Sequence, residues 1–95
     1  MNWMNSYKKL ADVYIEEFES RWNEGAETAI ALSRYVKTAF PGTARVLDVP
    51  CGIGRLSIPL SLQGFNVLGI DFSDKVIEYA NKKKQNLVLK LRTLL

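Results

Sequence analysis

Apolar residues recur every three or four positions through the first 40 residues, which predicts two amphipathic helices. The first is expected to start at Asn5 or Ser6 and to end before Gly25. The second is expected to cover residues 26–40 and to stop at the Pro-Gly pair that follows. One face of each helix collects the apolar side chains expected in a core: Trp3, Tyr7, Leu10, Tyr14 and Phe18 in the first, and Ala29, Leu32, Val36 and Phe40 in the second.

After Gly42 the pattern changes to short apolar runs separated by turns. A run that is apolar on nearly both faces is typical of a buried parallel strand. The runs predict a strand over residues 44–49, a helix over 55–63, a strand over 66–70 and a helix through about residue 83 that Ser73 caps. This alternation predicts an α/β fold, a partial Rossmann-like βαβ(αβ) unit in a parallel sheet, preceded by the two helices.

The tail fits two patterns. Leu87, Leu89 and Leu91 alternate as a third strand would, whereas Leu87, Leu91 and Leu94 have helical spacing, and we favour the strand. With 95 residues the chain is expected to form one domain. We divide it into a helical lead-in (1–42), a βαβα unit (43–84) and a tail of uncertain structure (85–95), and we expect this domain to be truncated.

Composition excludes several classes of protein. The 95 residues are 47% hydrophobic and include a single cysteine, Cys51, and no histidine. Histidine-dependent hydrolysis and most metal sites are therefore not expected. The apolar runs are shorter than a membrane span requires, and without an apolar leader we expect a cytoplasmic protein. The net charge of +3 comes largely from three lysines at a helix end, where they complement the helix dipole, so nucleic acid is not an expected partner.

A Gly-x-Gly turn links the first predicted strand to its helix, at Gly52 and Gly54. Glycines also serve tight turns that bind nothing, so this signal alone is weak. Asp71, however, lies 19 positions after Gly52 at the end of the next strand, where a ribose-binding acid belongs in a nucleotide site. Because Ser73 is available to cap the following helix, Asp71 is free for that role.

Asp48, just before the turn, separates two classes of cofactor. In a dinucleotide site the pyrophosphate lies over this turn, and a neighbouring carboxylate would repel it. S-adenosylmethionine carries no phosphate but has a sulfonium and an ammonium group, both of which a carboxylate attracts. The two acids around the turn therefore favour a cationic nucleoside as the ligand.

Two segments resemble the signatures of a known family. Asp48-Val-Pro-Cys-Gly-Ile-Gly-Arg55 resembles the first signature of class I S-adenosylmethionine-dependent methyltransferases, and Leu68-Gly-Ile-Asp-Phe-Ser73 is similar to the second. The resemblance covers roughly residues 44–84, and beyond them the tail departs from the family's usual spacing.

The resemblance implies roles for individual residues. Asp48 and the turn that contains Cys51, Gly52 and Gly54 would hold the methionine end of the cofactor. Asp71 would accept both ribose hydroxyls, and Phe72 would pack on the adenine. Arg55 would either fix the loop or cover apolar surface, and Tyr14 or Arg21 could reach the methionine carboxylate. The chain departs from the family at Pro50, where glycine is more usual; proline has no N–H and fixes φ.

We therefore expect the S-adenosylmethionine-binding half of a methyltransferase, a transferase that is inactive as this chain alone and has no assignable catalytic residue. Two alternatives stay open. One is an NAD-type oxidoreductase fragment, against which Asp48 counts. The other is a truncated or frameshifted product that acts only as a binding or assembly module. The expected partners are S-adenosylmethionine, its product S-adenosylhomocysteine, and further copies of the chain. The first strand would leave an unpaired edge, so we expect a homodimer or higher oligomer that uses this edge or the tail.

Overall fold

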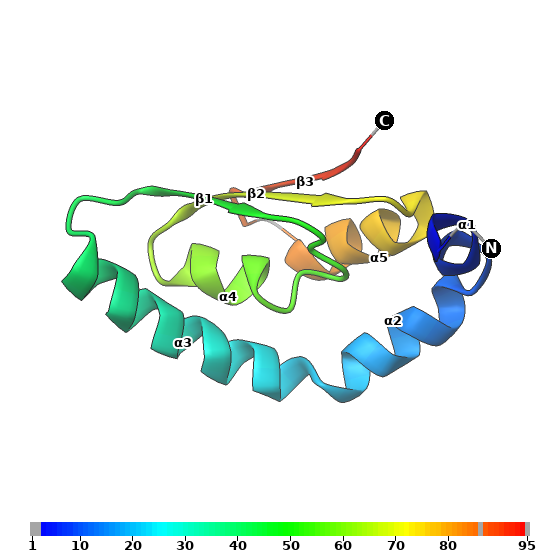
Figure 1. Cartoon of the computed structure of the whole chain (residues 1–95), viewed down its shortest axis with the longest axis horizontal. Helices are drawn as coiled ribbons and strands as arrows, with labels where there is room; N and C mark the ends of the chain where they lie inside the picture. The colour runs from blue at the N-terminus through cyan, green and yellow to red at the C-terminus, as the bar shows by residue number, and fades with distance from the viewer. Residues whose placement is uncertain (1–2, 86, 95) are drawn as a thin grey trace.

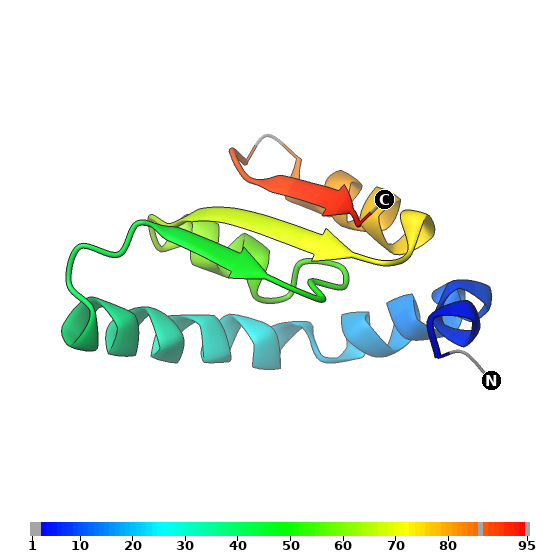
Figure 2. The ribbon, with the colours of Figure 1, turned by 45° about the horizontal axis from the view of Figure 1, so that its top comes forward.

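In the part of the chain that the structure describes, three parallel strands form a sheet along one side of the protein. The computed structural model describes residues 3–85 and 87–94. Its strands are β1 (Arg45–Asp48), β2 (Asn66–Asp71) and β3 (Lys90–Thr93), in the order β1-β2-β3. Figure 2 shows the three arrows pointing the same way, toward the N-terminal helix. The predicted α/β fold with a parallel sheet is confirmed.

The helices lie on one side of this sheet (Figure 1). Helix α4 (Ser57–Leu62) packs on β2, and α5 (Asp74–Lys84) packs on β2 and β3. A second layer is formed by α2 (Ala11–Ser20), which packs on α5, and α3 (Trp22–Ala39), which packs on α4. Within the part of the chain that the structure describes, no helix has both the length and the apolar character needed to cross a bilayer.

From residue 3 on, the helical lead-in contains three helices where two were predicted. Helix α1 (Trp3–Lys9) is separated from α2 at Leu10, and α2 is separated from α3 at Arg21. Gly25, expected to follow the first helix, instead lies buried in the first turns of α3. A Cβ there would be 2.7 Å from both the Cβ and the carbonyl oxygen of Arg55. Glycine is therefore needed for close packing and does not mark a helix end.

These breaks change which side chains reach the core. Tyr7 is buried as predicted, but Leu10 is 49% exposed because it lies at the break, and Ala11 is buried beside it. In α3 the buried positions are Gly25, Ala29 and Ser33. The helix packs through this row of small side chains, which turns Leu32 and Phe40 outward, so their predicted core positions were wrong. The side chain of Trp3 lies outside the described residues.

The βαβα unit follows its prediction closely. Asn66 N–H donates to the Ala44 carbonyl over 2.7 Å at the start of the β1–β2 pairing. Ser73 caps α5, since its hydroxyl oxygen accepts from the Val76 N–H over 3.3 Å. The apolar side of α5 is buried, and three lysines form its last turn, where they complement the helix dipole.

The tail forms a strand, as we favoured. β3 pairs with β2 in parallel, and Leu89 and Leu91 are buried while Lys90 between them is exposed. Because β3 takes the outer side of β2, it does not cover the edge of β1. β1 is the last strand on its side of the sheet. Leu47, on that strand, is 64% exposed.

Candidate functional site

A pocket of about 330 Å³ lies where β1 and β2 end, between the glycine turn and the two N-terminal helices. The carboxyl ends of parallel strands are the usual place for ligands in open α/β sheets. The walls of the pocket come from the helices α1 and α2, from the ends of β1 and β2, and from the glycine turn. The lining residues are Tyr7, Tyr14, Phe18, Asp48, Pro50, Cys51, Gly52, Ile53, Arg55, Leu56, Asp71 and Phe72.

The two glycines of the turn have different roles. Both have positive φ, +55° at Gly52 and +89° at Gly54, which glycine adopts without strain. A Cβ on Gly52 would be 3.2 Å from the Phe18 ring, so the glycine lets the aromatic ring close on the turn. A Cβ on Gly54 would be 3.0 Å from Ile58 in α4. Gly54 thus supports the turn from behind and does not line the pocket, whereas Gly52 does.

Asp71 is fully buried and holds the turn against β2. Its Oδ2 accepts the Gly52 N–H over 2.8 Å, and its Oδ1 accepts the Ser73 N–H over 3.2 Å. The Tyr7 phenol lines the same pocket as this carboxylate. Burial, then the bond to Asp71, then the charge of Asp71 raise the pKa of Tyr7 well above its usual value, so the phenol stays protonated.

Asp48 lies on the neighbouring strand end and also faces the pocket. Its Oδ2 accepts from the Ser57 hydroxyl over 2.7 Å. Partial burial, and to a smaller extent the charge of Asp71, raise the pKa of Asp48 above its usual value. The hydrogen bond from Ser57 and the charge of Arg55 lower this pKa but do not cancel the rise. Two carboxyl groups on adjacent strand ends give the floor of the pocket an acidic character.

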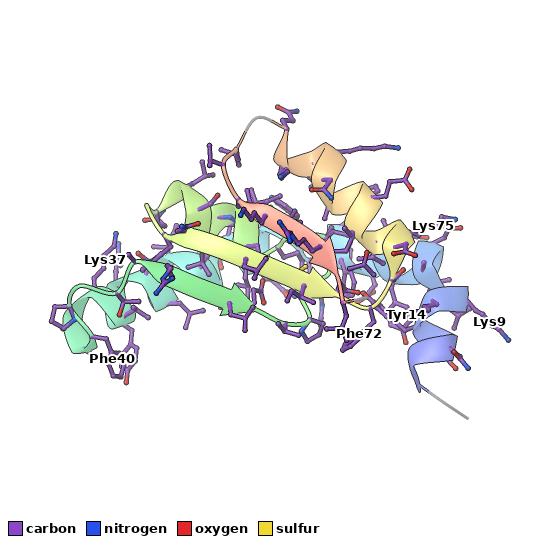
Figure 3. All side chains as sticks on the ribbon, turned by 90° about the horizontal axis from the view of Figure 1, so that it is seen from above. Lys9, Tyr14, Lys37, Phe40, Phe72 and Lys75 are labelled. Atoms are coloured by element: carbon purple, nitrogen blue, oxygen red, sulfur yellow. The ribbon has the colours of Figure 1, made fainter. Side chains whose placement is uncertain are left out.

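Aromatic rings form the opposite wall. The Tyr7 and Tyr14 rings meet edge to face with centroids 4.8 Å apart, and the Phe18 ring lies 6.1 Å from that of Tyr14. Figure 3 shows Tyr14 and Phe72 next to each other at this end of the molecule. Sequence reasoning treated Tyr7 and Phe18 as core residues only. The aromatic residues on one helical face were a signal for a ligand site, since such a face can form the wall of a pocket. Only the fold places that face opposite the glycine turn.

Arg55 and Arg21 contact each other instead of both facing a ligand. Arg55 lines the pocket, and its Nη1 donates to the Arg21 carbonyl over 2.9 Å at the break between α2 and α3. The Arg21 side chain pairs with Glu17 and Glu24 on the surface and is not among the lining residues. Of the two candidates for the methionine carboxylate, only Tyr14 therefore lines the pocket.

Cys51 is buried in the pocket wall. Burial, followed by the charges of Asp71 and Asp48, raises the pKa of its thiol to about 12. A thiol that stays protonated at neutral pH is not a nucleophile. Among residues 3–85 and 87–94, no group of acidic or cysteine side chains has an arrangement that could hold a metal ion.

Comparison with known proteins identifies the family. Residues 46–94 match the family model described as a methyltransferase domain. The chain belongs to the class I S-adenosylmethionine-dependent methyltransferases. The match includes the tail beyond residue 84, so the expectation that the resemblance stops there was wrong.

Individual relatives agree with this assignment. Glycine N-methyltransferase of Oryctolagus cuniculus is 40% identical over 78 residues, which are 82% of this chain and 25% of that protein. Ubiquinone biosynthesis O-methyltransferase of Rickettsia prowazekii is 44% identical over 50 residues, which are 53% of this chain and 20% of that protein. The chain thus spans about a quarter or less of the length of these curated relatives.

Solved structures share the fold. Magnesium protoporphyrin IX methyltransferase from Synechocystis, solved with bound S-adenosylhomocysteine, superposes with a TM-score of 0.69 at 20% identity, covering 96% of this chain and 49% of that one. The plantazolicin methyltransferase BpumL, also solved with S-adenosylhomocysteine, has a TM-score of 0.65 at 26% identity, covering 88% of this chain and 32% of that one.

Proposed function

We propose that this chain binds S-adenosylmethionine and S-adenosylhomocysteine in the pocket, as the cofactor-binding part of a methyltransferase. The observation that carries the proposal is the pair Asp48 and Asp71 on adjacent strand ends, facing a wall of aromatic rings across a glycine turn. An acidic floor suits a ligand with a sulfonium and an ammonium group, and aromatic rings suit cations and an adenine. Two solved relatives hold S-adenosylhomocysteine.

The same residues disfavour a dinucleotide. A pyrophosphate over this turn would lie beside Asp48, and the positive side chain that lines the pocket, Arg55, already donates one hydrogen bond to the Arg21 carbonyl. Carboxylates near a pyrophosphate are repelled more strongly where water is excluded. We therefore rank NAD below the sulfonium cofactor.

Each lining residue has a proposed role. Asp71 holds the ribose hydroxyls and Phe72 packs on the adenine. Asp48, with Cys51 and Gly52 in the turn, contacts the methionine end, where Tyr14 supplies a hydroxyl. Gly54 and Arg55 keep the turn in shape, the first through its packing on Ile58 and the second through the Arg21 carbonyl.

The bound cofactor supplies an electrophilic methyl group on a positively charged sulfur. Transfer to a nitrogen, oxygen or carbon nucleophile depends mainly on holding the acceptor in line with the carbon–sulfur bond. Among the described residues we assign no catalytic base, and the methyl acceptor stays open.

Assembly through β1 is a second part of the proposal. The open edge of β1, with its exposed Leu47, is the kind of edge that pairs with another chain. We propose a homodimer or higher oligomer that uses this edge. We also propose a cytoplasmic protein, on the ground that its one cysteine is a buried free thiol.

Calorimetric titration tests the cofactor assignment. S-adenosylmethionine, S-adenosylhomocysteine and NAD are titrated into the purified chain under the same buffer and salt conditions. We expect both adenosyl ligands to bind more tightly than NAD. If NAD bound more tightly than either of them, the proposal would be refuted.

A further inference from the structure

Glu19, near the end of α2, binds two residues of α5. Its Oε1 accepts from the Tyr79 hydroxyl over 2.9 Å and also from the Lys83 ammonium group. Tyr79 and Lys83 lie four positions apart, so they share one face of α5. The Lys83 Nζ also lies 4.2 Å from the centre of the Trp22 ring, at the start of α3. These contacts connect α2, α3 and α5.

The Glu19 contacts are better suited to hold α2 than the other ion pair between α2 and α5. The side chains of Lys83 and Glu19 are 28% and 33% exposed, whereas those of Lys75 and Asp12 are 61% and 77% exposed. Exposed ion pairs contribute little because water screens their charges. The hydrogen bond from Lys83, and to a smaller extent that from Tyr79, lower the pKa of Glu19 although partial burial opposes them. The carboxylate is therefore ionised at neutral pH.

Phe18, the residue before Glu19, faces the pocket. A Cβ on Gly52 would be 3.2 Å from the Phe18 ring, so this ring packs directly on the glycine turn. Tyr14 lies one helical turn earlier on the same face and also lines the pocket, with its ring centroid 6.1 Å from that of Phe18. Successive residues of an α-helix point about 100° apart. The side of α2 that binds α5 therefore adjoins the side that forms the aromatic wall.

We propose that Glu19 is a positioning residue for the pocket: its bonds to α5 fix the rotation of α2 about its own axis, and this rotation keeps the Phe18 and Tyr14 rings over the glycine turn. Glu19 is not a lining residue and acts through Phe18. The inference rests on the proposed binding of S-adenosylhomocysteine in this pocket. A helix that rotates carries all its side chains with it, so loss of the Glu19 anchor moves the aromatic wall relative to the turn.

Ligand titration of matched variants tests this role. Glu19→Ala removes the carboxylate, and Lys83→Met removes the ammonium group on α5 but keeps an apolar chain beside Trp22. Asp12→Ala is the control, because it also removes an acid of α2 that pairs with a lysine of α5, but in an exposed position. S-adenosylhomocysteine is titrated by calorimetry into the wild type and the variants, at a temperature where circular dichroism shows them folded.

We expect Glu19→Ala and Lys83→Met to bind S-adenosylhomocysteine roughly three- to tenfold more weakly than the wild type, and Asp12→Ala to match the wild type. Wild-type affinity in Glu19→Ala overturns the positioning role and leaves the proposed function standing, as does an equal loss in Asp12→Ala. No binding by the wild type refutes the proposed function and the inference together. If Glu19→Ala does not fold, Lys83→Met decides by the same criterion.

A spectroscopic signature separates positioning from stability alone. An aromatic ring shifts the resonances of protons beside it, and in the wild type the Phe18 ring lies against Gly52. Without ligand, we expect nuclear magnetic resonance to show that the Gly52 α-protons lose part of this ring-current shift in Glu19→Ala and keep it in Asp12→Ala. Unchanged Gly52 resonances in a Glu19→Ala protein of lower thermal stability would mean that Glu19 stabilises the fold without placing the wall, and would overturn the inference.

Discussion

The Gly52 N–H donates to the carboxylate of Asp71 over 2.8 Å, and this bond joins the glycine turn to the end of the neighbouring strand. The acid proposed to bind the ribose therefore also shapes the turn beneath the ligand. Binding and stability are coupled at this residue, and variants of Asp71 should change both.

Asp71→Ala should weaken binding of S-adenosylhomocysteine by at least about tenfold and lower the free energy of unfolding by roughly 1–3 kcal/mol, because it leaves the Gly52 and Ser73 N–H groups without their acceptor. Calorimetry and urea unfolding measure the two effects. Asp71→Asn keeps an acceptor at this site and should recover part of the stability but not the affinity. Full affinity in either variant would contradict the ribose role.

Asp48 should cost stability at neutral pH. Burial raises its pKa in the folded state, so the native protein binds its proton more tightly than the unfolded chain does. The contribution of Asp48 to the free energy of unfolding is therefore most favourable at pH values below its ordinary pKa of 3.8. It is lost as the pH rises through the raised pKa of the folded state. Asp48→Asn, which keeps an acceptor for Ser57, should be more stable than the wild type at pH 7 and should bind S-adenosylmethionine less well.

Urea unfolding between pH 3 and pH 8 checks the Asp48 prediction. The stability difference between Asp48→Asn and the wild type should grow with pH over the acidic range and then become constant. A difference that shrinks with rising pH would show that the carboxylate is stabilised in the fold, contrary to the prediction.

Gly25→Ala should destabilise the protein although alanine favours helices. The new Cβ would be 2.7 Å from the Arg55 carbonyl oxygen, and a backbone atom cannot move aside cheaply. The expected loss is roughly 1–3 kcal/mol, the usual cost of overpacking. Gly69→Ala is a useful comparison, because its Cβ would meet side-chain atoms and no backbone atom: the Leu91 Cδ2 at 2.6 Å, and the Cys51 Cβ and the Ser57 Oγ at 3.0 Å. Thermal unfolding should rank Gly25→Ala as the less stable variant, and the opposite ranking would contradict the dominance of the backbone contact.

Leu47→Lys should prevent assembly through β1. A charge on an edge strand opposes pairing with another chain. Light scattering after size exclusion should give a multiple of 10.8 kDa for the wild type and 10.8 kDa for the variant. Leu62→Lys, on an equally exposed leucine of α4, is the control and should leave the assembly intact. A monomeric wild type at all concentrations would refute the proposal.

Local patterns predicted the βαβα unit well. Strand β2 is a short, mostly apolar run between turn residues, and the Ser73 cap depends on two residues only three positions apart in the chain. Position along the chain pointed to Asp48, Gly52, Gly54 and Asp71, and the family resemblance added Cys51, Arg55 and Phe72; all of them except Gly54 line one pocket. Their grouping was predictable because the ends of neighbouring parallel strands meet at one edge of the sheet.

Packing between distant segments decided the rest. Gly25 reads locally as a helix end, and only its approach to Arg55, 30 positions later in the chain, makes it an interior helix residue. In the sequence, Tyr7 is indistinguishable from the other apolar residues on the same helix face. It lines the pocket because α1 lies next to the glycine turn, and no local periodicity encodes that approach. The sequence thus determined the βαβα unit and the acidic floor of the pocket, whereas tertiary packing decided where the lead-in helices break and which aromatic rings line the pocket.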